Sequence, residues 1–138
     1  MTYNIEDVSR TDDGEYVCTA TAEFHDGTTG SGQGTTQLFI QYSPDVEGGE
    51  VSCKEGDAIT LHCEVDANPE PHTYTWTKDG QRLSDQQNHT IQATHRDQAG
   101  DYNCTAINQF HDGSEGKGHA VIKLEVQYPY RTICSELK

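Results

Sequence analysis

Short segments in which hydrophobic and polar residues alternate run from about residue 58 to residue 126. A period of two is typical of a β-strand that buries one face. On this basis we expect strands at residues 58–65, 73–78, 89–94, 101–107 and 121–126. No segment shows a sustained helical period. The pattern therefore predicts an all-β protein built as an antiparallel sandwich.

The alternation also predicts which side chains face the core. These are Ile59, Leu61, Cys63, Val65, Tyr74, Trp76, Ile91, Ala93, Tyr102, Cys104, Ala106, Ile122, Leu124 and Val126. Asp79-Gly80 follows the strand at 73–78 directly. Because glycine tolerates a positive φ, this pair predicts a tight hairpin turn.

The chain repeats itself at an offset of 86 residues. The segment GEYVCTATAEFHDGTTGSG, from Gly14, aligns without a gap with GDYNCTAINQFHDGSEGKG, from Gly100. Such a long match indicates a duplicated unit. We expect a complete unit at residues 43–128 and a tail at 129–138, whereas residues 1–42 match only the last half of a unit.

The complete unit carries a recognisable set of residues: Cys63, Trp76, and the run D-Q-A-G-D-Y-N-C that ends at Cys104. This set resembles an immunoglobulin-like domain. The resemblance implies a Cys63–Cys104 disulfide between the two sheets, with Trp76 packed on it. It also implies that the Tyr102 hydroxyl bonds to backbone near the corner that begins around Asp97. The 40 residues between the cysteines are too few for a variable domain and indicate the C2 or I-set type.

Further segments resemble the tandem arrays of intercellular-adhesion-molecule-like receptors: C-T-A-I-N at 104–108, N-P-E-P at 68–71 and V-Q-Y-P at 126–129. The resemblance implies that residues 1–42 hold the C-terminal strands of a preceding immunoglobulin-like domain. Such a piece leaves its inner face without an opposing sheet. We therefore expect residues 1–42 to come from a longer protein, whose membrane anchor would lie outside this fragment. The first ten residues lack the features of a signal peptide.

Five cysteines leave at least one thiol unpaired within the chain. Cys18 lacks its expected partner, and a bond between Cys53 and Cys134 is left open by the sequence. There is no CxxC pair and no HExxH spacing. We therefore expect neither a metal site nor a cofactor.

Charge narrows the function classes. Acidic residues outnumber basic ones 23 to 9, for a net charge of −14. This argues against partners such as nucleic acid and anionic membranes, which need clustered basic residues. No apolar run approaches the roughly 18–20 residues of a membrane span. The carboxylates are dispersed and no nucleophile or phosphate-binding motif stands out, so we expect a solvated acidic surface and no enzyme.

Two kinds of motif could carry function. The sequence F-H-D-G occurs at residues 24–27 and 110–113. A hairpin turn is the favoured interpretation, and a binding loop is the alternative. N-x-[ST] sequons start at Asn88 and Asn103, and both side chains are expected to be exposed and able to carry a glycan in a secreted chain.

These observations favour a non-catalytic recognition module of an extracellular adhesion or cell-surface receptor protein. Its partner would be a protein on another cell or in the matrix. The alternative is a structural spacer domain in a long array, either in the extracellular matrix or of the intracellular muscle type. The expected disulfide and the sequons favour the extracellular side, since disulfides persist in oxidising compartments.

Overall fold

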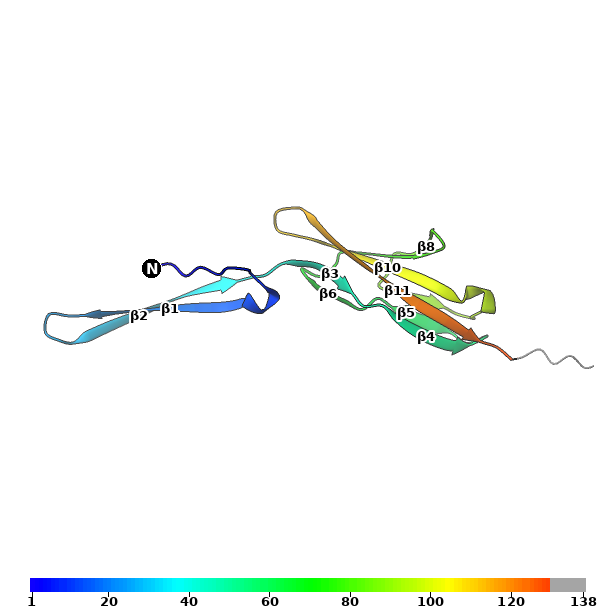
Figure 1. Ribbon diagram of the computed structural model, residues 1–138, viewed down its shortest axis with the longest axis horizontal. Coiled ribbons are helices and arrows are strands. Elements are labelled where there is room, and N and C mark those ends of the chain that lie inside the picture. Colours follow the sequence, from blue (N-terminus) through cyan, green and yellow to red (C-terminus); the bar gives the residue numbers. More distant parts are fainter. Residues whose placement is uncertain (130–138) are drawn as a thin grey trace, which may run out of the picture. The chain divides into compact units, whose positions relative to one another are not determined.

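The computed structural model describes residues 1–129 and contains two compact units, the first from Met1 to Tyr42 and the second from Ser43 onward (Figure 1). Both consist of β-strands, with no α-helix among the described residues. The prediction of an all-β protein is confirmed. Most of the expected tail, including Cys134, lies outside the described residues.

A five-stranded sheet forms one layer of the second unit. Its strand order is β4 (Gly49–Lys54), β11 (Glu115–Gln127), β10 (Gly100–Gln109), β7 (Thr73–Lys78) and β8 (Gln81–Ser84). The β4–β11 pair is parallel, and the other neighbours are antiparallel. Asp79 and Gly80 take φ values of 51° and 77° between β7 and β8, which confirms the expected hairpin turn.

Two strand pairs complete this unit. β5 (Ile59–His62) pairs with β9 (Asn88–Ile91), and β3 (Tyr42–Val46) pairs with β6 (Val65–Asn68). A short 3-10 turn, η2 (Arg96–Gln98), leads into β10. The β5–β9 pair contributes Leu61 and Ile91 to the core that it shares with the five-stranded sheet.

The core is one cluster of buried side chains: Leu61, Cys63, Trp76, Ile91, Tyr102, Cys104, Ile122, Leu124 and Val126. Burying one such aliphatic side chain stabilises a fold by about 1.5–3 kcal/mol. Cys63 and Cys104 are joined by a disulfide with their Cα atoms 6.1 Å apart. This bond links the segment after β5 to the centre of β10.

The structure corrects two details of the predicted strands. The expected strand at 58–65 is two strands, because the chain leaves β9 after His62 and pairs with β3 from Val65. The expected inward position of Ala93 is wrong. Strand β9 ends at Ile91, and Thr94 is buried instead, with its hydroxyl donating to the Asp57 carbonyl oxygen at 2.7 Å.

The first unit is a two-stranded antiparallel ribbon. A 3-10 turn, η1 (Arg10–Asp12), precedes β1 (Gly14–Glu23), which pairs with β2 (Thr29–Leu38). Its register repeats that of β10 and β11: Cys18 faces Gly34 in the ribbon, and Cys104 faces Ala120 in the second unit. No side chain of residues 1–42 is buried.

Candidate functional site

Two buried aromatic residues, Tyr102 and Trp76, fix strands β10 and β7 through hydrogen bonds to backbone carbonyl oxygens. Tyr102 is 2% exposed, and its hydroxyl donates to the Gln98 carbonyl oxygen at 2.7 Å. Burial, followed by the charge of Asp79, raises the pKa of this phenol, so it stays protonated and keeps donating. Trp76 is fully buried opposite Cys104 and donates its ring N–H to the Gln87 carbonyl oxygen at 3.3 Å.

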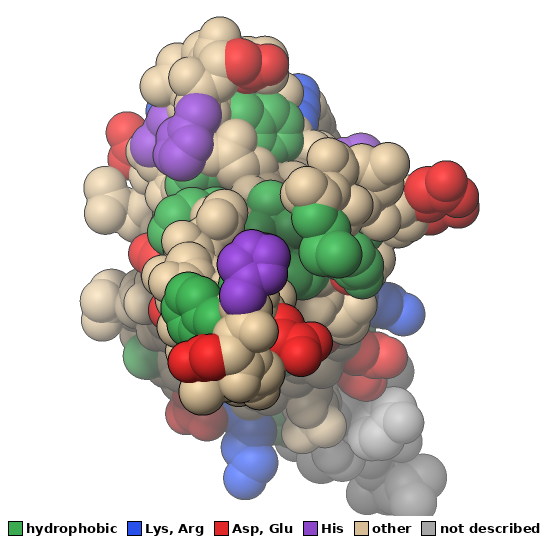
Figure 2. All heavy atoms as spheres, turned by 90° about the vertical axis from the view of Figure 1, so that its left-hand side faces the viewer, with side chains coloured by type: hydrophobic (Ala, Val, Ile, Leu, Met, Phe, Trp, Pro, Cys, Tyr) green, Lys and Arg blue, Asp and Glu red, His purple; other side chains and the backbone are tan. Residues whose placement is uncertain are grey.

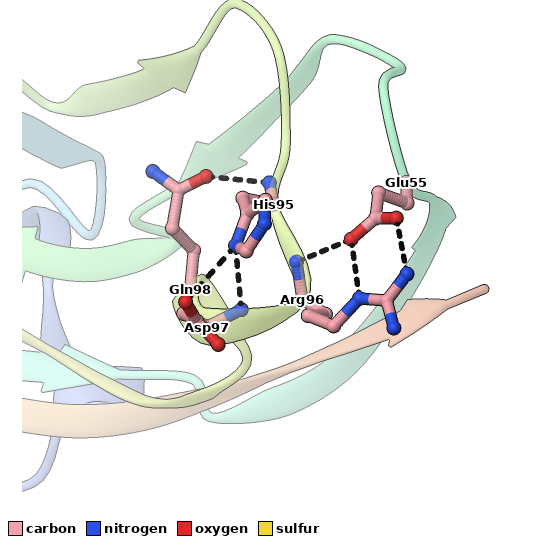
Figure 3. A network of polar contacts seen from close by, with 5 residues as sticks. All are labelled: Glu55, His95, Arg96, Asp97 and Gln98. Atoms are coloured by element: carbon pink, nitrogen blue, oxygen red, sulfur yellow. Dashed lines mark hydrogen bonds and ion pairs between the residues drawn. The ribbon is translucent and has the colours of Figure 1, made fainter.

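A charged clamp fixes the turn before β10 to the end of β4 (Figure 3). The Arg96 guanidinium donates to both carboxylate oxygens of Glu55 at 2.8 and 2.9 Å, and the Arg96 backbone N–H donates at 2.9 Å. These bonds, the side-chain one first, lower the pKa of Glu55 to about 2. Arg96 also lies 4.2 Å from the centre of the Tyr128 ring, a cation–π contact. Sequence analysis missed this clamp, because its partners are far apart in sequence and have no fixed spacing.

The F-H-D-G segment after β10 is a preformed hairpin turn. The Phe110 N–H donates to the Ser114 carbonyl oxygen at 2.8 Å, and Gly113 has a φ of 87°. One carboxylate oxygen of Asp112 accepts from the Ser114 hydroxyl at 2.6 Å and from its N–H at 2.9 Å, which lowers the pKa of Asp112. Residues 24–28 form the same bonds in the ribbon. The favoured interpretation as a turn agrees with this geometry.

The outer face of the five-stranded sheet is a second candidate surface. Cross-strand rows on β7, β10 and β11 place Thr77, Asn103 and Val121 together, then Thr75, Thr105 and His119, and then Thr73, Ile107 and Lys117. Val121 is 46% exposed. Acidic side chains, red in Figure 2, appear at many separate places on the face drawn there rather than in one patch. Sequence analysis did not select these rows, although they occupy the positions that alternate with the predicted core.

The two sequons have different surroundings. Asn88 starts β9, is exposed, and its side-chain oxygen contacts the Nδ1 atom of His62. Asn103 alternates with Tyr102 and Cys104 as expected, but it is half-buried rather than exposed. Its side-chain oxygen is enclosed and has no hydrogen-bond partner among the described residues.

Other candidate chemistry is limited in the part of the chain that the structure describes. Cys18 is an exposed free thiol and Cys53 is a half-buried one. Over residues 1–129, His, Cys, Asp and Glu side chains form no group of three or more that could hold a metal ion. No helix in this range is long and apolar enough to span a membrane.

Comparisons with known proteins agree with this geometry. A family model described as an immunoglobulin domain matches residues 40–108. The chain belongs to the immunoglobulin domain family. Neural cell adhesion molecule 1 of Bos taurus is 33% identical over 119 residues, and the human protein is 32% identical over the same length. Each match covers 76% of this chain and 13% of the relative, so the chain spans about an eighth of these relatives.

Solved immunoglobulin-domain structures share the fold. Sidekick-1 immunoglobulin domains 1–4 match with a TM-score of 0.58 at 20% identity, covering 91% of this chain and 34% of that one. A DIP-gamma pair of domains matches with a TM-score of 0.57 at 19% identity, covering 87% and 63%. A titin tandem matches at 0.52 and 20% identity, covering 86% and 64%. The immunoglobulin-domain resemblance drawn from Cys63, Trp76 and Cys104 is therefore confirmed.

Proposed function

We propose that this chain is a non-catalytic recognition module of an extracellular or cell-surface adhesion protein. The observation that carries the proposal is the outer face of the five-stranded sheet, where threonine rows lie beside Val121 and Lys117. Such a face offers hydroxyl donors, an apolar contact and charge without a catalytic cleft. The curated relatives are named as adhesion molecules, which supports a protein ligand over a small substrate.

Basic and acidic side chains both lie on this face. Lys117, His119 and Lys123 alternate along β11 between Glu115 and Glu125, and Lys123 lies 4.0 Å from Glu50 of β4. A protein partner on another cell or in the matrix would meet these side chains first if it approached the sheet. Complementary acidic groups on that partner would speed association and fix its orientation, and their effect would weaken with salt.

The proposal includes the domain organisation and the glycans. We take residues 43–128 as a complete immunoglobulin domain of the C2 or I-set type. Asn88 is an exposed acceptor for a glycan, whereas a glycan on Asn103 would need room that its half-buried side chain lacks. A glycan on the chain would place it in the secretory pathway.

The alternative is a structural spacer in a long array. The likeness to a titin tandem concerns the fold alone and fits the alternative no better than the proposal. A spacer would need no accessible binding face. The two functions therefore differ in what a substitution on the outer sheet face would do.

The experiment compares two matched threonine-to-arginine variants. Thr105 lies on the outer face of the five-stranded sheet, and Thr60 lies on the β5–β9 pair, where its hydroxyl contacts that of Thr90 at 2.9 Å. Beads coated with the chain are mixed with each other and with neural cells, before and after cell-surface proteolysis. We expect adhesion that proteolysis abolishes, that Thr105→Arg weakens and that Thr60→Arg leaves intact. Beads that never adhere, or variants that behave alike, would refute recognition through this face.

A further inference from the structure

His89 is a titratable side chain at a core-facing position of β9. Its two neighbours along the strand, Asn88 and Thr90, are exposed, whereas the His89 side chain is half-buried. Its cross-strand partner on β5 is Leu61, which is 1% exposed. Because directly opposite residues of a strand pair project from the same face, the imidazole lies on the inner face of the β5–β9 pair.

The ring of His89 lies against the two large aromatic residues of the core. Its centre is 6.3 Å from that of Trp76 and 6.0 Å from that of Tyr102. Trp76 is completely buried and Tyr102 is 2% exposed. The ring nitrogens of His89 form no hydrogen bond to any residue that the structure describes. The imidazole therefore occupies a place in the packing that an uncharged ring fits better than a cation.

Other histidines of the second unit have acidic neighbours. Three exposed histidines each lie beside a carboxylate oxygen: His62 with Glu64 at 3.4 Å, His72 with Glu115 at 3.7 Å, and His95 with Asp97 at 3.2 Å. A carboxylate at such a distance balances the charge of a protonated ring. Within the described part of the chain, His89 has no carboxylate in that position. A proton on His89 would therefore meet no local counter-charge.

A cavity of about 480 Å³ opens beside the His89 ring. Tyr102 lines it on one side, and Leu83 of β8, which is 40% exposed, lies at its rim. Protons from solvent can therefore reach the imidazole from this side. The same space gives the ring room to turn away from the core.

The charged groups of β7 and β10 do not favour a proton on His89. The Lys78 ammonium lies 5.6 Å from the centre of the Tyr102 ring, so a protonated His89 would bring a second positive charge to the same ring. The Tyr102 phenol is neutral, because burial raises its pKa. Asp79 pairs with Lys78 at 3.2 Å, and its side chain is 87% exposed and well hydrated.

The remaining elements around the ring add one acidic side chain. Among the described residues that line the cavity, the charged ones are Lys78 and Asp97 of η2. Asp97 already lies 3.2 Å from the His95 ring. Strand β5 contributes the uncharged Leu61 opposite His89. Burial is accordingly the dominant influence, and it lowers the pKa of His89 below the ordinary value of 6.5.

We propose that His89 is an acid sensor: when its ring takes up a proton, the packing of β9 on Trp76 and Tyr102 weakens and the second unit loses stability. The step is the reversible transfer of one proton from solvent to a ring nitrogen. Because the folded pKa is lowered, the unfolded chain takes up this proton first. The stability that the neutral ring contributes is present above pH 6.5 and is lost as the pH falls from 6.5 towards the folded pKa.

The range in which this switch works is that of acidic cell compartments. Histidine-based switches act at about pH 5–6, as in endosomes. A cell-surface protein meets this acidity when it is taken up by the cell. This use of the switch rests on the proposed function, whereas proton uptake by His89 does not.

The first test compares two histidine-to-glutamine variants of the whole chain. Urea unfolding is followed through Trp76 fluorescence at about pH 7.5 and about pH 5.5. His89→Gln removes the sensor, and His25→Gln, in the first unit, is the matched control. The Glu55 clamp keeps its full contribution above about pH 4.5 and adds little to the difference.

One proton sets an upper limit to the expected effect. At one pH unit below 6.5, it lowers the ratio of folded to unfolded chain by at most about tenfold, which is about 0.7–1.4 M in the urea midpoint. On acidification, the midpoints of the parent and of His25→Gln should fall by up to this amount more than that of His89→Gln. An equal fall in the parent and in His89→Gln would overturn the proposal.

A direct titration of the parent chain makes the test independent of whether the variant folds. The ring resonances of His89 are assigned in NMR spectra by their contacts with Trp76 and Tyr102 and are followed as the pH is lowered. We expect a titration midpoint below pH 6.5, with the Trp76 and Tyr102 ring signals shifting in parallel. A midpoint at or above 6.5 would contradict the proposal. Neither measurement depends on the bead adhesion assay, so the proposed function and the acid sensor can fail separately.

Discussion

Removing the Cys63–Cys104 disulfide tests the account of the core most directly. The two cysteines are 41 positions apart. For a loop of that length, the loss of unfolded-state entropy on cross-linking amounts to about 4 kcal/mol at 25 °C. The double variant Cys63→Ala/Cys104→Ala should therefore lose about 4 kcal/mol of unfolding free energy.

The chain offers a well-placed probe for this loss. Its one tryptophan, Trp76, is fully buried beside the disulfide in the second unit, so fluorescence reports on that unit. At a urea slope of about 1–2 kcal/mol/M, the midpoint should fall by about 2–4 M. The melting temperature should fall by about 15–30 °C, since about 1 kcal/mol shifts a domain of this size by 4–8 °C.

Cys18→Ala is the matched control. Cys18 is exposed on the ribbon and forms no disulfide among the described residues, so its removal should leave the Trp76 midpoint unchanged. Chemical reduction of Cys18→Ala should then reproduce the loss seen in the double variant. A double variant within about 0.5 kcal/mol of the parent, the range of ordinary surface substitutions, would refute the entropic reasoning.

Three further outcomes follow from named contacts. Tyr102→Phe removes the bond to Gln98 and should cost about 1 kcal/mol in urea unfolding, whereas Tyr16→Phe should leave the Trp76 transition unmoved. Because the folded pKa of Glu55 is lowered from 4.5 to about 2, its contribution is fully present above about pH 4.5 and is lost as the pH falls towards 2. Glu55→Gln should therefore flatten the acid limb of stability against pH, and an unchanged slope would contradict the clamp. In a secretory host, Asn88→Gln should remove a glycan detected by mass, and Asn103→Gln should not.

Local signals in the sequence predicted the elements that depend on neighbouring residues. The Asp79-Gly80 turn follows from the backbone freedom of two adjacent residues, and it forms as expected. The prediction of one strand at 58–65 was wrong at the C-terminal end of that segment. Its first part pairs with β9 and its last part with β3, and both partners are distant in the sequence. The predicted inward position of Ala93 was wrong for a similar reason. The Thr94 hydroxyl donates a hydrogen bond to the Asp57 carbonyl oxygen, and Thr94 is buried there. A period-two pattern does not predict such a distant partner.

The candidate surface was harder to predict than the core. Core positions are set by burial, which a hydrophobic pattern records directly. For Asn103, the alternation of hydrophobic and polar residues gives the face of the sheet on which the side chain lies, but not how far that side chain is buried. Asn103 lies between Thr77 and Val121 of the neighbouring strands, and its side-chain oxygen is enclosed. The Glu55–Arg96 clamp likewise joins two residues that only the folded chain brings together, and no sequence motif marks the pair.

The repeat within the chain separates local from long-range determinants of the fold. Two hydrogen bonds of the ribbon have nearly the same lengths as their counterparts in the second unit. The Tyr16 hydroxyl bonds to the Asp12 carbonyl oxygen at 2.8 Å, against 2.7 Å for Tyr102 and Gln98, and the Asp26–Thr28 side-chain bond is 2.5 Å, against 2.6 Å for Asp112 and Ser114. These contacts are therefore set by the local sequence and by strand pairing alone. The local sequence does not determine burial in the same way. Cys18 and Ala20 are exposed on the ribbon, whereas the equivalent Cys104 and Ala106 are completely buried in the second unit, where other strands cover them. Glycine shows the same division: a Cβ on Gly118 would overlap the Pro44 carbonyl oxygen, whereas a Cβ on the equivalent Gly32 would have nothing within 4 Å, so the requirement for glycine arises from the long-range contact and not from the strand pair itself.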